Sequence, residues 1–267
     1  MCCFSVASPI GWVARLVSAV TPPVHISATN IFARMTAPGV QALAYSMNLE
    51  TRDPVAMILP LPIVPGSGEA AVTFIDLSQH PRMFERLHAL FEAPMLASRS
   101  KGGFGGGGPR TTLVVHAVGS FIASYVPTRA DFDRLDKRFR MPDVLFDAVP
   151  HYADYGFAVF QLEPGTTTVH PMALAFPTRA PDQLFFPTVH VHDGTFKRTA
   201  KFDHALYFQT KRRTAIGEYA PSGFFEGSEV AWSLPNESYG GLVEPSDAML
   251  LRKLRRRLPN EDTWIAA

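Results

Sequence analysis

The chain has 267 residues, of which 46% are hydrophobic and 18% are charged, and this composition is ample for a large buried core. Its net charge of +1 gives no overall electrostatic reason to expect a nucleic acid or an acidic partner. No apolar run approaches the roughly 20 residues that a membrane-spanning helix needs, so we expect no transmembrane segment.

Two adjacent cysteines, Cys2 and Cys3, are the only ones in the chain. Adjacent cysteines rarely bridge each other because the geometry is strained, and no disulfide framework is available. This pattern favours a reducing compartment, and we expect a cytoplasmic protein. Residues 9–20 are mildly apolar but interrupted by Gly11 and Arg15, which predicts a local insertion or short helix rather than a signal peptide.

The start of the chain also suggests a chemistry. If the initiator methionine is removed, the free α-amino group of Cys2 can act as the base for its own thiol, as in N-terminal nucleophile hydrolases. Some amidohydrolases of that class begin Met-Cys and continue into a strand. The competing interpretation is a buried or metal-touching pair of thiols at an ordered terminus.

Several strands are predicted along the first two thirds of the chain. Residues 24–35 and 41–49 predict two strands with a hairpin turn at Pro38-Gly39. Residues 55–64, VAMILPLPIV, predict a third, and its prolines indicate an edge or a bulge. Further strands are predicted at residues 72–76, within 111–126, and at 155–162. The chain therefore reads as strand-rich.

Three helices are predicted from capping residues and helical spacing of apolar side chains. They begin at Ser78, Thr128 and Ser246 and run to about Phe91, Phe139 and Leu258. Together with the strands they predict an α+β fold, with a mostly antiparallel, mixed β-sheet and about three packed helices. We expect a single domain over residues 1–267, with residues 98–110 as a flexible Gly-rich excursion.

The strongest functional signal is the stretch LFFPTVHVH at residues 184–192, followed by an Asp-Gly turn. Alternation along a strand puts His190 and His192 on one face, about 6.5–7 Å apart, so that both imidazoles can reach one ion. His170 and His204 lie on predicted strands before and after this stretch. Asp193 or Asp203 can accept a hydrogen bond from the imidazole nitrogen that does not bind the metal.

A cluster of neutral imidazoles suits zinc, copper or iron, and three protein ligands leave one position open for water or substrate. Our leading hypothesis is therefore a divalent-metal site formed by His190, His192, His204 and His170, and a metal-bound water would make the protein a hydrolase. The alternatives are the Cys2 amidohydrolase and a non-enzymatic binding or scaffold domain with structural histidines. The sequence leaves open whether the protein is an enzyme, and whether Cys2 and Cys3 join the histidines.

The last predicted helix has one strongly basic side. Its cations are Arg252, Lys253, Arg255, Arg256 and Arg257. A basic amphipathic helix can contact nucleic acid or an acidic membrane. Because the whole chain is close to neutral, a solvated face is the favoured interpretation, and the sequence carries no specific signal for a nucleic-acid partner.

A family resemblance accompanies these patterns. The chain resembles a group of bacterial proteins of uncharacterised function in its segments MCCFS, NIFAR, AMILPLPIVP, SYVPTRADFDRLD, YADYGFAVFQL, HPMALAFPTR and LFFPTVHVHDG. It is also distantly similar to a broader bacterial domain-of-unknown-function family. The resemblance runs from Met1 to about Gln209, and it implies a folded member of the family without implying any activity, cofactor or catalytic residue.

Overall fold

A computed structural model provides the structure of the protein. It describes residues 2–6, 24–52, 54–92, 116–118, 121–136, 140, 143–163, 165–191, 195–210, 224–225, 227–231 and 237–267. The predicted Gly-rich excursion at 98–110 and the segment 9–20 lie outside these ranges.

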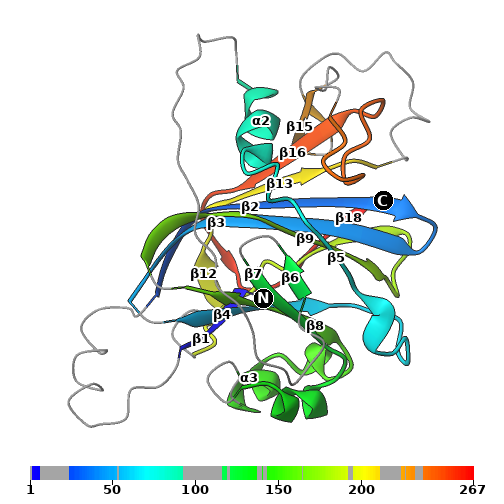
Figure 1. The fold of residues 1–267 in the computed structure, drawn as a ribbon. Coiled ribbons are helices and arrows are strands. Elements are labelled where there is room, and N and C mark those ends of the chain that lie inside the picture. Colours follow the sequence, from blue (N-terminus) through cyan, green and yellow to red (C-terminus); the bar gives the residue numbers. More distant parts are fainter. Residues whose placement is uncertain are drawn as a thin grey trace.

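The larger of two main sheets has eight strands in the order β14-β15-β16-β13-β2-β3-β9-β5 (Figure 1). Its bounds are β2 Val24–Ala37, β3 Val40–Thr51, β5 Thr73–Ile75, β9 Gly165–Pro177, β13 His204–Phe208, β14 Phe224–Phe225, β15 Ser228–Ala231 and β16 Met249–Leu254. The predicted hairpin is confirmed, since β2 and β3 pair antiparallel and Gly39 takes φ +70°, a left-handed conformation that suits glycine. Only the pairing of β13 with β2 is parallel among the described pairs of this sheet.

The second sheet has six strands in the order β11-β1-β4-β8-β7-β6. They are β1 Cys2–Val6, β4 Val55–Leu61, β6 His116–Val118, β7 Phe121–Val126, β8 Gly156–Leu162 and β11 His190–Val191. The prolines were expected to indicate an edge or a bulge, but β4 lies between β1 and β8 and pairs with β8 without a shift of register. Among the described residues, β1 pairs with β4 from Val55 to Ile58, so Pro60 lies beyond the described part of that pairing and is paired with Phe157 of β8.

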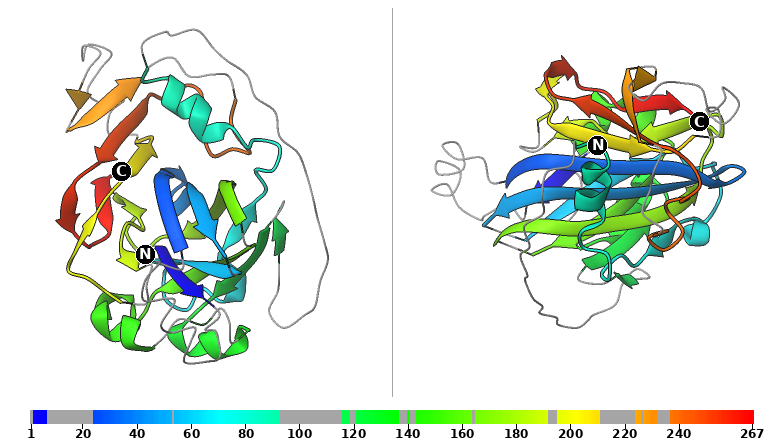
Figure 2. Two further views of the ribbon diagram at one scale, coloured as in Figure 1. Left: turned by 90° about the vertical axis from the view of Figure 1, so that its left-hand side faces the viewer. Right: turned by 90° about the horizontal axis from the view of Figure 1, so that it is seen from above.

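The two sheets pack face to face and enclose the main core, with a thinner apolar layer outside each sheet. Alternate residues of β3 show this division: Leu43 and Tyr45 lie in the main core, whereas Ala42 and Ala44 lie in the cluster under α2 (Met83–Ala89). On the far side, α3 (Asp143–Ala148) and the 3-10 helices η2 (Arg129–Arg134) and η4 (Pro150–Tyr152) cover the six-stranded sheet. Figure 2 shows α2 and α3 on opposite sides of the two sheets.

Two small antiparallel pairs complete the described fold. β10 (Gln183–Phe186) pairs with β18 (Thr263–Ala266), and β12 (Thr199–Lys201) pairs with β17 (Arg257–Pro259). Both pairs join the end of the chain to the histidine-bearing segment. They bring residues 257–266 beside residues 183–201, and this contact positions the site.

The predicted sheet content is confirmed as mixed and mostly antiparallel, whereas the described helices are short and form only a minor part of the fold. The first predicted helix is present as α2, and the second is the short 3-10 helix η2. Thr128 precedes η2, but its hydroxyl donates to Asp131 at 2.7 Å and does not cap a backbone N–H.

The third predicted helix, Ser246 to Leu258, is wrong: residues 249–254 and 257–259 are the strands β16 and β17. β16 lies between β15 and β13. Its apolar residues are buried on both faces of the sheet, with Leu250 in the main core and Met249 and Leu251 in the cluster under α2. A run that is buried on both sides needs no alternation, so helical spacing in it was misleading. No helix in the described ranges has the length and apolar character needed to cross a membrane.

Candidate functional site

Two of the predicted histidines, His190 and His204, meet in the structure. His190 lies on β11 at the edge of the six-stranded sheet, and His204 begins β13 in the eight-stranded sheet. Their Nε2 atoms are 3.1 Å apart. His204 is buried at 3% exposure and His190 is half-buried, so the pair lies beneath the surface where the two sheets approach each other.

The rings converge on their Nε2 atoms. Their centroids are 4.7 Å apart, farther than the two nitrogens, and their planes differ by 33°. The buried ring of Phe202 contacts both imidazoles, with centroids 4.7 Å from His190 and 5.3 Å from His204. This packing limits the rotation of both rings and holds the two nitrogens in place.

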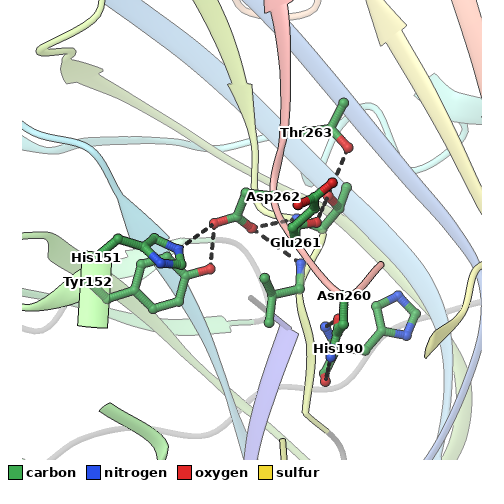
Figure 3. Close-up of polar contacts among 9 residues, drawn as sticks. His151, Tyr152, His190, Asn260, Glu261, Asp262 and Thr263 are labelled. Carbon is green, nitrogen blue, oxygen red and sulfur yellow. Dashed lines mark hydrogen bonds and ion pairs between the residues drawn. The ribbon is translucent and has the colours of Figure 1, made fainter. Parts of the chain in front are cut away.

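The backbone of residues 188–190 is held by side chains from residues 260–262 (Figure 3). The amide of Asn260 accepts from His190 N at 2.7 Å and donates to His190 O at 2.9 Å. The Oδ1 of Asp262 accepts from the backbone N–H groups of Thr188 at 3.0 Å and Val189 at 3.2 Å. These side chains supply hydrogen-bond partners to the backbone of residues 188–190, as the backbone of a neighbouring strand does elsewhere in a sheet. They thereby fix the position of His190.

Asp262 is itself an unusual group, because its side chain is only 4% exposed. Its second oxygen accepts a hydrogen bond from the Tyr152 hydroxyl and lies 3.9 Å from His151 Nε2. Burial acts to raise the pKa of the carboxyl, but the amino-terminal charge and the hydrogen bonds outweigh it and lower the pKa below its ordinary value. Asp262 is therefore a buried carboxylate with several partners.

Cys2 is placed beside this pair by strand register. β1 runs parallel to β11, with Cys2 opposite His190 and Cys3 opposite Val191, and β1 pairs with β4 on its other side. The structure describes the backbone of β1 but not its side chains. His192 and Asp193 lie outside the described residues.

The other predicted residues lie elsewhere. His170 is on β9, three strands from β13 and so about 14 Å away across the sheet, where its ring packs on Phe121 with centroids 4.0 Å apart. Burial lowers the pKa of His170. Asp203 is exposed, and its carboxylate accepts from Ala28 N at 3.2 Å instead of holding an imidazole.

Among the described side chains, no group of three or more His, Cys, Asp and Glu is arranged to hold a metal ion. The side chains of Cys2 and His192 are not among those described.

Asn260 and Asp262 were missed by sequence analysis. They stand more than 60 residues from the backbone groups they bind, in a stretch without a motif. Tyr152 and His151 precede a strong strand and are polar, but only the fold reveals their common partner. A local signal for such a network does not exist, because its members come from three separate parts of the chain.

The chain has been compared with known proteins in three ways. No family model matches it, and no curated protein matches it. Among solved structures, it is similar to a crystal structure of baculovirus P35, with 14% identity, a TM-score of 0.46, and coverage of 91% of this chain and 97% of that chain. It is also similar to the caspase-8/P35 complex, with 12% identity, a TM-score of 0.45, and coverage of 90% and 96%.

A third similar structure is a mutated baculovirus P35 after caspase cleavage, with 14% identity, a TM-score of 0.44, and coverage of 90% of this chain and 100% of that chain. At these identities and TM-scores the likeness is loose, and no conclusion about the function of this chain follows from it.

Proposed function

We propose that this protein binds a divalent transition-metal ion, zinc in the first instance, through His190 and His204. The observation that carries the proposal is the 3.1 Å separation of the two Nε2 atoms. Two imidazole nitrogens bound to one zinc ion at about 2.0–2.1 Å in tetrahedral geometry stand roughly 3.3 Å apart, so a small outward shift would admit the ion.

The alternative for the pair is a hydrogen bond between two neutral imidazoles, with one ring as donor and the other as acceptor. That arrangement is stable without a metal. It corresponds to the interpretation of structural histidines in a binding domain. The convergence of two rings that Phe202 and Asn260 already hold favours the metal, because prior ordering of ligands reduces the entropy lost when the ion binds.

Cys2 is the third ligand that we propose, because its register position is directly opposite His190. A thiolate added to two imidazoles favours zinc or copper over iron. With three protein ligands, the remaining position is open to water, and a metal-bound water would carry out hydrolysis. His192, two residues after His190, is the candidate for a fourth ligand, which would close the site.

The first experiment is elemental analysis by mass spectrometry of the protein purified without a His tag. We expect about one metal ion per chain in the wild type and in His25→Ala, which removes an exposed histidine on β2. The double variant His190→Ala/His204→Ala should bind none. Replacing Cys2 with Ser should weaken zinc binding at least tenfold in a chelator competition if the thiolate is a ligand.

Near-stoichiometric metal that survives in the double variant would overturn the assignment of the site. So would a folded wild-type protein that contains no metal and takes up none when titrated with zinc, copper or ferrous iron. The second result would favour the binding-domain interpretation.

A second candidate function, the N-terminal cysteine nucleophile, is supported by one observation: Cys2 is the first residue of β1 and is paired with His190. Intact-mass spectrometry tests this candidate, since retention of Met1 would exclude it.

A further inference from the structure

A set of exposed cations gathers on the small sheet formed by β12 and β17. We call it the basic ribbon, and it consists of Lys197, Arg198, Lys201, Arg255, Arg256 and Arg257, all exposed. The sequence placed the last three on a helix together with other cations. The strand pairing instead joins Arg257 to Lys201, more than fifty residues earlier, which no local pattern indicates.

The register brings the charges close together. Lys201 pairs directly with Arg257, while Ala200 and Leu258, which point the other way, are half-buried. The ladder continues at both ends, with hydrogen bonds from Phe202 N to Arg256 O at 3.0 Å and from Asn260 N to Arg198 O at 2.9 Å. Directly opposed residues in an antiparallel pair have β-carbons about 4.5–5.5 Å apart, so Lys201 and Arg257 repel each other.

This concentration of charge is not a by-product of composition. Six of the 25 Lys and Arg side chains lie in these two short segments, although the net charge is only +1. No ion pair joins Lys201, Arg256 or Arg257 to a carboxylate within the part of the chain that the structure describes. By contrast, the neighbouring Lys253 pairs with Glu229 at 2.8 Å. A like-charge pair across a ladder destabilises the sheet, and an anionic partner would remove the repulsion.

We propose that the basic ribbon binds the phosphate backbone of a nucleic acid, without reading its bases. Four of its six cations are arginines, whose planar guanidinium groups match phosphate oxygens in pairs. The strand residues on the same face as Lys201 and Arg257 are Thr199 and Pro259, which offer no large apolar side chain for insertion into a lipid bilayer. Charge complementarity therefore favours a hydrophilic polyanion, and the proposal does not depend on the metal site.

The test is fluorescence anisotropy with a labelled single-stranded DNA 20-mer of mixed sequence, in chelator, between 50 and 200 mM salt. The chelator removes any bound metal from all variants, so a difference in DNA affinity between them cannot come from a difference in metal content. We expect log K to fall with log salt at a slope between about −2 and −4, because each neutralised phosphate of a single strand contributes about −0.7. Arg255→Glu/Arg256→Glu should reduce the affinity at least tenfold and the slope by about 1.4.

The matched control is Arg52→Glu/Arg82→Glu, which changes the net charge equally at exposed positions outside the ribbon. Its affinity should stay within threefold of the wild type. Lys201→Glu is a second ribbon variant that turns the repelling pair into an attractive one, so it should bind the 20-mer more weakly while remaining fully folded. This combination separates loss of a contact from loss of structure.

Three results would overturn the proposal. The first is absence of binding by the wild type at 50 mM salt. The second is an equal loss of affinity in the ribbon and control variants. The third is tighter binding to an acidic peptide or to vesicles that contain phosphatidylserine than to the oligonucleotide, which would assign the ribbon to another class of partner.

Discussion

The hydroxyl of Tyr152 donates a hydrogen bond to the buried carboxylate of Asp262, 110 positions away in the sequence. This contact joins η4, on the outer side of the six-stranded sheet, to the segment that holds residues 188–190. The position of His190 therefore depends on a charge that lies outside the histidine pair.

We expect Asp262→Asn to lower the free energy of unfolding at pH 7 by about 2–3 kcal/mol, because hydrogen bonds to a charged group are stronger and Asn cannot accept from Tyr152 through its nitrogen. Urea titration measures this loss. Asp182→Asn, at an exposed carboxylate, is the control and should change stability by less than about 0.5 kcal/mol.

The contribution of Asp262 to the free energy of unfolding should also depend on pH. The folded-state pKa of Asp262 is lowered, so its contribution is fully present above the unfolded-state pKa of about 3.9 and is lost as the pH falls through the folded-state pKa. The stability difference between the wild type and Asp262→Asn should thus be constant from pH 7 to 5 and narrow below pH 4. A difference that widens in acid would contradict this assignment.

Gln41 ties the eight-stranded sheet to β10. Its fully buried amide donates to Phe185 O at 2.8 Å and accepts from Phe185 N at 2.9 Å. Gln41→Met keeps the length and most of the volume but leaves both backbone groups without this partner. We expect a loss of about 2–4 kcal/mol in chemical denaturation, whereas Gln161→Met, at a half-buried position on β8, should have a small effect. Similar losses in both would show that the amide pairing is unimportant.

Gly156 has a packing reason to be glycine. A β-carbon there would lie 2.5 Å from the phenol oxygen of Tyr125 and 2.6 Å from its Cε2. Tyr125 is itself buried, so its ring has little room to move away from Gly156. Gly156→Ala should therefore destabilise the protein by about 1–3 kcal/mol.

A double-mutant cycle identifies the cause. In a Tyr125→Ala background, which removes the obstructing ring, Gly156→Ala should lose less than half as much stability as in the wild type. Additive losses would mean that the effect arises from the backbone and not from this contact.

The like-charge pair Lys201 and Arg257 leads us to expect a substitution that stabilises the protein, unlike the substitutions above. Lys201→Glu replaces a like-charge pair by an attractive one, and we expect a gain of about 0.2–1 kcal/mol at low salt that disappears at high salt. Thermal unfolding at two salt concentrations measures it. Arg52→Glu has the same change of charge without a directly opposed cation and should show no such gain.

Local patterns in the sequence were sufficient for part of the fold. The turn at Pro38-Gly39, the buried runs of β4 and β8, and the apolar side of α2 are properties of a few consecutive residues, and each was predicted close to its observed place. Backbone conformation at a turn and periodicity along one element are short-range effects, so the sequence displays them directly.

Contacts between distant segments required the folded chain. The sequence selected His190 and His204 for their chemistry, but it could not separate them from His170, which the order of strands places far away. It assigned the basic residues near 255 to a helix, because nothing local shows that β16 is buried between two strands. Which strands become neighbours depends on the packing of the whole core. The order of the strands therefore decided that Asp262 contacts residues 188–190, that the two histidines meet, and that the cations of the basic ribbon lie together.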